Sequence, residues 1–304
     1  MKKILLILIA VLAFCPQSNA EEINNIALLT QKGFFETQQV TSAIPCEAVK
    51  RTLYLHQKYA NSYNLDKLRS LYSEQFINAD GLNKELYFDL IKKTWASYPD
   101  IKYKMDIINI QVDGDMAVVQ VNESADATTT SKSGMVNENG LLSSISNSVY
   151  YFEKINNEWL ITSDHIIFEK TSLRYGSAKN IQIELSAPCQ ILANTQYTTS
   201  LNIEPPKNSL VIASIGRENI TYPQTVAEEI FRKLPDDGTL ERVFVSNSKN
   251  LNEYAVASFG ITKAEISNGT EVKIYVTGLG FVMSRVNVIP KNDFIKVANN
   301  EKSK

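Results

Sequence analysis

The stretch "NEWLITSDHIIFEK", residues 157–170, decides the fold expected for the first half of this 304-residue chain. Successive side chains of a β-strand point to opposite faces of the sheet, and apolar residues recur here with that period of two. Strict alternation places Trp159, Ile161 and His165 on one face and Asp164 on the other. The sequence therefore predicts a strand with a buried tryptophan-bearing face, from which His165 looks inward while Asp164 looks outward. Only a β-bulge would bring both side chains to one cavity.

Three helical segments are expected before this strand. Pro45 suits the first turn of a helix, and apolar residues then recur at helical spacing as far as Tyr63, with His56 on the same stripe. A second, shorter helix is predicted within "LDKLRSLYSEQF" and a third within "NKELYFDLIKKTWASYP", which ends before Pro99.

After Pro99 the periodicity changes from helical to strand-like. Two long hairpins are predicted, the first turning at Asp113-Gly114 and the second at Asn156-Asn157. Helices followed by antiparallel strands make an α+β unit, in which the helices pack on one face of a curved sheet.

The order of these landmarks over residues 45–170 resembles the nuclear transport factor 2-like superfamily, especially its SnoaL-like branch. The resemblance is carried by "AVKRTLYLHQKYANSYNLDKLRSLYSEQFINADG", "YPDIKYKMDIINIQVDGDMAVVQV" and the closing "NEWLITSDHIIFEK". It implies a cone-shaped domain over residues 45–171, with three helices and a curved sheet around a pocket. It also implies a homodimer, because cones of this superfamily often associate through the sheet.

The second half of the chain has a different texture. Short β-rich runs such as "NIQIELS", "SLVIASI" and "EVKIYVTGL" are separated by Asn, Pro, Gly and Ser clusters, which predicts an immunoglobulin-like β-sandwich over residues 181–290. We expect a linker at residues 172–180 and a polar tail at 291–304. Residues 225–235, "TVAEEIFRKLP", fit either a helical insert or an edge strand.

The amino terminus has the features of a bacterial secretory signal. Lys2 and Lys3 precede a short apolar stretch, and small residues lead up to Ala20, which predicts a signal peptide over residues 1–20. A leader segment follows over residues 21–44. The alternative is a lipoprotein signal that anchors the protein through Cys15, but Phe14 stands where such signals usually have a small residue. We therefore expect a periplasmic or secreted protein, with no transmembrane segment in the mature chain.

An exported protein meets an oxidising compartment, so Cys46 and Cys189 are candidates for a disulfide. The alternative, two separate buried thiols, stays open at this point. Neither cysteine has the spacing of a metal ligand, and no metal site or cofactor is expected. A net charge of −2 and a pI near 5.9 do not favour nucleic acid as a partner.

The candidate site is the pocket that the cone is expected to enclose. We predict that it is lined by His56, Tyr63, Trp159 and His165, and that it takes a small apolar ligand or is used in self-association. The sandwich would contact a protein or a glycan. The alternative is an isomerase, dehydratase or hydrolase in which His165 acts as general base or acid. No motif of a known enzyme class transfers residue by residue.

Overall fold

The computed structural model describes residues 43–223, 229–267 and 271–291. The predicted signal peptide with Cys15, nearly all of the leader and nearly all of the polar tail lie outside these residues. Among those described, the chain begins with α3 (Ala43–Asn61), α4 (Leu65–Arg69) and α5 (Lys84–Ser97). Four long strands follow: β1 (Lys102–Asp113), β2 (Met116–Lys132), β3 (Asn139–Ile155) and β4 (Glu158–Gly176). None of the described helices is both long and apolar enough to cross a bilayer.

The second half of the described chain is almost entirely β-structure. It consists of a short 3₁₀ helix η1 (Ser177–Asn180) and the strands β5 (Ile183–Ser186), β6 (Gln190–Leu192), β7 (Gln196–Ile203), β8 (Leu210–Asn219), β9 (Arg232–Lys233), β10 (Thr239–Val245), β11 (Glu253–Ser267) and β12 (Glu271–Ile289).

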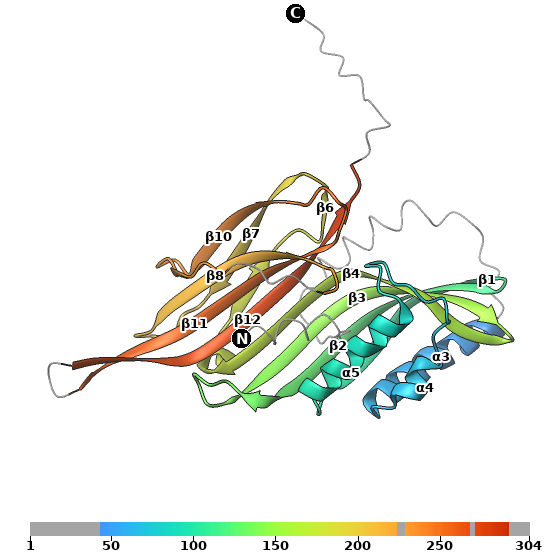
Figure 1. The fold of residues 1–304 in the computed structure, drawn as a ribbon, viewed down its shortest axis with the longest axis horizontal. Helices are drawn as coiled ribbons and strands as arrows, with labels where there is room; N and C mark the ends of the chain where they lie inside the picture. The colour runs from blue at the N-terminus through green and yellow to red at the C-terminus, as the bar shows by residue number, and fades with distance from the viewer. Residues whose placement is uncertain (1–42, 224–228, 268–270, 292–304) are drawn as a thin grey trace, which may run out of the picture.

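A single nine-stranded sheet runs through both halves of the molecule (Figure 1). Its order is β1-β2-β3-β4-β12-β11-β8-β9, with β6 paired to β12, while β10, β7 and β5 form a separate three-stranded sheet. The two halves are joined where residues 170–176 of β4 pair antiparallel with residues 278–284 of β12. The predicted linker at 172–180 is therefore strand and 3₁₀ helix, because its first half is held by the ladder of β12.

The two faces of the long sheet are covered at opposite ends. The three helices lie over one face of β1–β4, and their core contains Leu53, Leu68 and Phe88 together with Trp159 of β4. The three-stranded sheet lies over the other face, where Leu201 of β7 packs with Phe259 of β11. The indole-bearing side of β4 does lie beneath the helices, as the sequence predicted.

Local sequence signals set most of the element boundaries. Pro45 lies in the first turn of α3, and the side chain of Asn83 caps α5 by accepting a hydrogen bond from the amide of Leu86. Both predicted hairpin turns are present, with Gly114 and the Asn156-Asn157 pair at positive φ.

The second helix is shorter than predicted. It ends at Arg69, and Tyr72 forms an isolated parallel bridge with Ile161 of β4. The Ile161 amide donates a hydrogen bond to the carbonyl of Leu71 at 2.9 Å. This carbonyl is therefore bonded to β4 and not to the amide of a further helical turn. Of the ambiguous stretch 225–235, residues 225–228 lie outside the described residues, and Arg232–Lys233 forms the edge strand β9.

The predicted disulfide is absent from the structure: Cys46 and Cys189 are both partly buried thiols. Cys46 belongs to the first turn of α3, which packs on β1 and β4. Cys189 lies next to β6, where its carbonyl accepts from the amide of Asn287 at 2.9 Å. The two residues are thus fixed by different parts of the fold, α3 over the β1–β4 face and the start of β6 beside β12.

Candidate functional site

Two β-bulges in β4 decide which of its side chains face the helices. In the pairing with β3, Phe152 lies opposite Ile161 and Tyr151 lies opposite Ser163, so that Thr162 is skipped. One skipped residue moves every following side chain to the other face. Beyond Thr162 the inward positions are therefore the even-numbered ones, beginning with Asp164.

The second bulge restores the original phase. Asn147 lies opposite Phe168 and Ser148 opposite Ile166, so that Ile167 is skipped. Beyond it the odd-numbered residues face the helices again, and Glu169 is buried on that side. Asp164 and Glu169 thus both point to the helix-covered face, although they are five positions apart and strict alternation would place them on opposite faces.

The predicted orientation of the Asp164-His165 pair is therefore wrong. Asp164 is the inward residue, only 1% exposed, whereas His165 lies on the opposite face and is half-buried. Partial burial is the main cause that lowers the pKa of His165. Its imidazole is separated by the sheet itself from the cavity in which it was expected to act.

Buried aromatic side chains pack against one another beneath the helices. Tyr72 is at the centre of an aromatic cluster, with ring centroids 4.9 Å from Phe76, 5.0 Å from Phe88 and 5.6 Å from Tyr87. The Nε2 atom of His56 is hydrogen-bonded to the Tyr72 hydroxyl at 2.8 Å. Burial lowers the pKa of His56 to about 4, so this imidazole is neutral at physiological pH.

Two buried carboxyl groups adjoin this aromatic cluster. The Tyr150 hydroxyl donates to Glu123 Oε1 at 2.8 Å, and Ser146 Oγ donates to Oε2 at 3.4 Å. Burial raises the pKa of Glu123 to about 7, and burial likewise raises the pKa of Asp164 to about 7. Asp164 Oδ2 and the Tyr87 hydroxyl are buried without a hydrogen-bond partner among the described residues. These carboxyl and hydroxyl groups can exchange protons near neutral pH. They would take part in acid–base chemistry only if a substrate entered the interior beneath the helices.

The four residues predicted to line one pocket are not brought together. His56 and Trp159 are both buried under the helices, where Trp159 is 6% exposed. Tyr63 lies apart, with its hydroxyl donating to the Ile101 carbonyl at 2.8 Å and its ring against Trp95. His165 is on the other face of the sheet.

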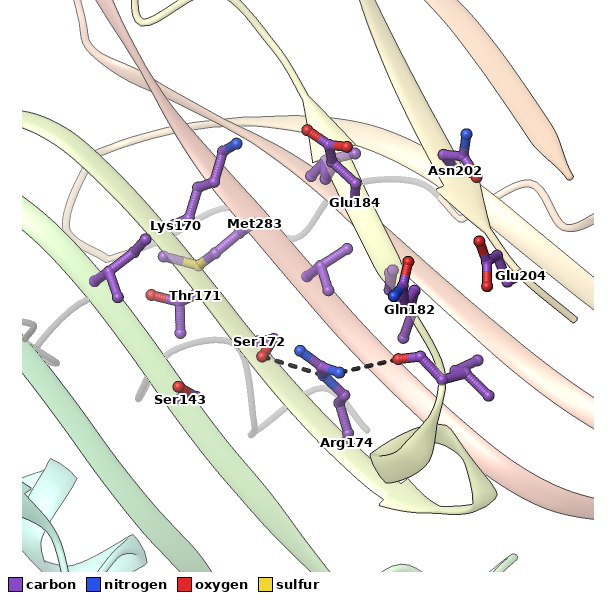
Figure 2. Close-up of a pocket in the computed structure, with 15 residues that line it drawn as sticks. Ser143, Lys170, Thr171, Ser172, Arg174, Gln182, Glu184, Asn202, Glu204 and Met283 are labelled. Carbon is purple, nitrogen blue, oxygen red and sulfur yellow. Dashed lines mark hydrogen bonds between the residues drawn. The ribbon is translucent and has the colours of Figure 1, made fainter. Parts of the chain in front are cut away.

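An open groove lies on that other face, between the outward side of β3 and β4 and the edge of the smaller sheet (Figure 2). Its volume is about 670 Å³, within the range of roughly 300–1,000 Å³ typical of ligand sites. It is lined by Ser143, Ile145, Lys170, Thr171, Ser172, Arg174, Ile181, Gln182, Ile183, Glu184, Leu185, Asn202, Glu204, Val282 and Met283. Sequence periodicity did not predict this groove, and the one local signal for it is the alternation of polar residues at Lys170, Ser172 and Arg174.

The groove is lined by two cations, Lys170 and Arg174, and by two carboxylates, Glu184 and Glu204. Arg174 donates from Nε to Ser172 Oγ at 3.4 Å and from Nη1 to the Ile181 carbonyl at 3.3 Å (Figure 2). Neither Arg174 nor Lys170 forms an ion pair with a described carboxylate. Burial lowers the pKa of Arg174. A partly desolvated guanidinium without a counter-charge is a natural anchor for an anionic group. Within the described ranges, no three His, Cys, Asp or Glu residues are grouped so as to hold a metal ion.

Comparison with known proteins gives fold-level similarity only. No family model matches the chain, and no curated protein matches it. Among solved structures, a conserved protein from Planctomyces limnophilus is similar at 15% identity and a TM-score of 0.35, covering 40% of this chain and 94% of its own. A putative scytalone dehydratase from Novosphingobium aromaticivorans is 13% identical, with a TM-score of 0.34 and coverages of 40% and 83%.

A putative dehydratase of the NTF2-like family from Streptomyces avermitilis is 15% identical, with a TM-score of 0.35. That similarity covers 41% of this chain and 97% of the other. These values assign neither an activity nor a ligand to this chain.

Proposed function

We propose that this chain is an exported binding protein, without catalytic activity, whose ligand site is the groove beside Arg174. The observation that carries the proposal is the contrast between the two faces of β4. The helix-covered side is packed with Tyr72, Phe76 and their neighbours, whereas the other side opens into a groove of about 670 Å³ whose two cations, Lys170 and Arg174, form no ion pair with a described carboxylate.

In this proposal residues 45–171 are a SnoaL-like cone and residues 181–290 an immunoglobulin-like sandwich. The first assignment is supported by the three helices on one face of β1–β4. The second is supported by the core that joins β7 to β8 and β11 across the two sheets. Because β4 and β12 share one sheet, the groove is built from both units and needs both for its shape.

A homodimer is part of the same proposal, through the outward face of the strands at the β1 end. Met116, Val118 and Tyr151 are exposed large hydrophobic residues on β2 and β3. Their side chains point away from the helices, since Ala117, Val119 and Tyr150 occupy the inward positions. Sedimentation at several protein concentrations would measure this association, and Tyr151→Lys should weaken it.

The binding proposal is tested by recording amide NMR spectra of the mature protein while adding ligands of different classes. The panel holds short peptides, neutral oligosaccharides and the uncharged apolar dye Nile red. We expect shifts at groove amides such as Ser172 and Gln182, and no fluorescence increase of the dye, because the interior is filled. A dye that binds with displaced signals of His56 and Trp159 would instead place the ligand under the helices. Fractionation of expressing cells tests export.

A second candidate, an acid–base enzyme, is favoured by one observation. Asp164 Oδ2 and the Tyr87 hydroxyl are buried, close to the His56-Tyr72 pair, and lack hydrogen-bond partners among the described residues. A carboxyl with a pKa near 7 suits general acid–base catalysis. His165 has no place in this version. Turnover in a panel of β-hydroxy ketones and enolisable ketones that is lost in Asp164→Asn but kept in His165→Ala would support the enzyme and overturn the binding protein.

A further inference from the structure

Strand β5 leaves one edge of the smaller sheet without a partner strand. Among the described strands β5 pairs only with β7, in the register Ile183 to Ile203 and Leu185 to Leu201. The amide of Glu204 donates to the Gln182 carbonyl, which makes this a hydrogen-bonded pair of the antiparallel ladder. Since such pairs alternate, the amide and carbonyl groups of Ile183 and Leu185 point away from β7.

The second wall of the groove is formed by side chains of the long sheet. Lys170, Ser172 and Arg174 project from alternate positions of β4 on the side of the smaller sheet, and Ser143 and Ile145 project from β3. Residues 181–185 line the same space as an unbroken run. An unbroken run indicates that the backbone edge itself, and not one face of the strand, borders the groove.

These two walls are the free edge of one sheet and the face of another, which is where a further strand of a two-layer sandwich would lie. Neighbouring strands lie about 4.8 Å apart and stacked sheets about 10 Å apart. A chain added beside β5 would extend the smaller sheet from three strands to four and cover the outward side of β4. Its backbone would pair with Ile183 and Leu185, and alternate side chains would point down towards Lys170, Ser172 and Arg174.

The charges of the groove select among such chains. Arg174 already donates to the carbonyl of Ile181, which fixes its guanidinium at the end of the β5 edge. Together with Lys170 it presents positive charge on the β4 side of the groove, and neither cation forms an ion pair with Glu184 or Glu204, the two carboxylates that line the side of the smaller sheet. An acidic side chain pointing down from the added strand would complete this part of the groove.

We propose that the groove binds an extended peptide segment of another protein, which adds as a fourth strand along β5 and places an acidic side chain over Lys170 and Arg174. The inference rests on the proposed binding function and narrows its ligand to a peptide. Main-chain pairing supplies affinity in such strand addition, and the pockets for alternate side chains supply specificity.

The test uses the full mature chain and blocked peptides of alternating Thr and Val with a central Glu. Three matched peptides are compared with it: a central Gln, a central Lys, and the Glu peptide with every second amide N-methylated on its pairing edge. We expect the Glu peptide to shift the amide signals of Ile183 and Leu185. The Lys peptide and the N-methylated peptide should bind at least about tenfold more weakly.

Arg174→Gln should weaken binding of the Glu peptide more than binding of the Gln peptide, whereas Lys249→Gln, which removes an exposed cation outside the groove, should change neither. Near-ultraviolet circular dichroism checks that both variants are folded, and the peptide substitutions test the same contact without altering the protein. Equal binding of the Glu, Lys and N-methylated peptides overturns the inference. If oligosaccharides shift the groove signals and peptides do not, the groove is a ligand site but the peptide inference fails. If neither class shifts them, both proposals fail.

Discussion

Arg285 of β12 and Asp80 of the α4–α5 loop form a buried ion pair, with Nη2 2.6 Å from Oδ1. Asn252 donates to the same carboxylate oxygen at 2.8 Å, and Arg285 Nε donates to Asn287 Oδ1 at 2.8 Å. Burial acts to raise the pKa of Asp80, but the Arg285 guanidinium outweighs it and holds that pKa below its ordinary value. The amide of Ala79 donates a hydrogen bond to the Asp164 carbonyl, so this loop lies beside Asp164 of β4. The ion pair connects the same loop to β12, near the other end of the described chain.

Breaking this pair should destabilise the fold strongly. Arg285→Met leaves Asp80 as a buried charge without its partner, and we expect the free energy of unfolding to fall by about 3–5 kcal/mol. The double variant Asp80→Leu/Arg285→Met removes both charges and should be more stable than Arg285→Met. Urea denaturation measures both. Lys50→Met, which breaks an exposed pair with Glu47, is the control and should leave the midpoint unchanged; a loss for Arg285→Met no larger than that of the control would contradict the expectation.

The buried carboxyl of Glu123 should make stability depend on pH. Its pKa is about 7 in the folded protein against an ordinary value of 4.5, so between these pH values the folded state keeps a proton that the unfolded chain has released. The stabilising contribution is complete below about pH 4.5 and is lost as the pH rises to about 7. Gln does not titrate, so Glu123→Gln should gain stability relative to the wild type over this interval, by an amount on the order of 3 kcal/mol. Denaturation of both proteins at pH 4.5 and 7.5 measures the change. If the difference in unfolding free energy between the variant and the wild type is the same at both pH values, the pKa of Glu123 is not raised by folding.

The buried imidazole of His56 should make stability depend on pH in the opposite direction. Its pKa is lowered from 6.5 to about 4 by burial, so between these values the unfolded chain binds a proton that the folded protein does not. The neutral imidazole therefore favours folding more as the pH rises from about 4 to 6.5. His56→Gln should lose stability relative to the wild type over that interval. The same denaturation series checks this, and a shift in the same direction as Glu123→Gln would show that the imidazole is not buried.

Gly176 should tolerate substitution far less than Gly114. Both have nearly the same positive φ, +56° and +57°, which L side chains rarely adopt, and Gly176 in addition has ψ −134°, outside the left-handed region that Ala can enter. At Gly176, however, a Cβ would collide with the Thr277 carbonyl and with Val136, whereas the space around Gly114 is open. Thermal melting of the two Ala variants compares them. Equal melting points would mean that β4 does not turn beside β12 as described.

The thiols of Cys46 and Cys189 should both be present in protein purified without reductant. We expect alkylation of the denatured protein, followed by peptide mapping, to label both residues. Reductant should then leave the melting temperature unchanged. A peptide pair linked through these two cysteines, released only on reduction, would be the contrary result.

Sequence periodicity was sufficient for the local elements and insufficient for the orientation of β4. The turns at Asp113-Gly114 and Asn156-Asn157 depend on the conformational preferences of the residues themselves, and they are where the sequence predicts them. Thr162 and Ile167 are ordinary strand residues in type. Whether such a residue pairs or is skipped depends on the fit of β4 to β3, and this reversed the predicted faces of Asp164 and His165.

The amino-acid sequence by itself determined the class of each segment: helices first, then long hairpins, then further strands. It did not determine strand length in the second half, where β11 and β12 have 15 and 19 residues although short strands were expected. Only the tertiary structure decided that β4 pairs with β12, about a hundred residues further along the chain, and so merges the two halves into one sheet. The physical reason is that helix periods, caps and turns are local energies of neighbouring residues. Strand pairing depends on the relative free energies of all possible pairs of strand edges. Here those free energies include the packing of the helices on one face of the sheet and of the small sheet on the other. The groove beside Arg174 exists only because the pairing of β4 with β12 places β5 across from β4.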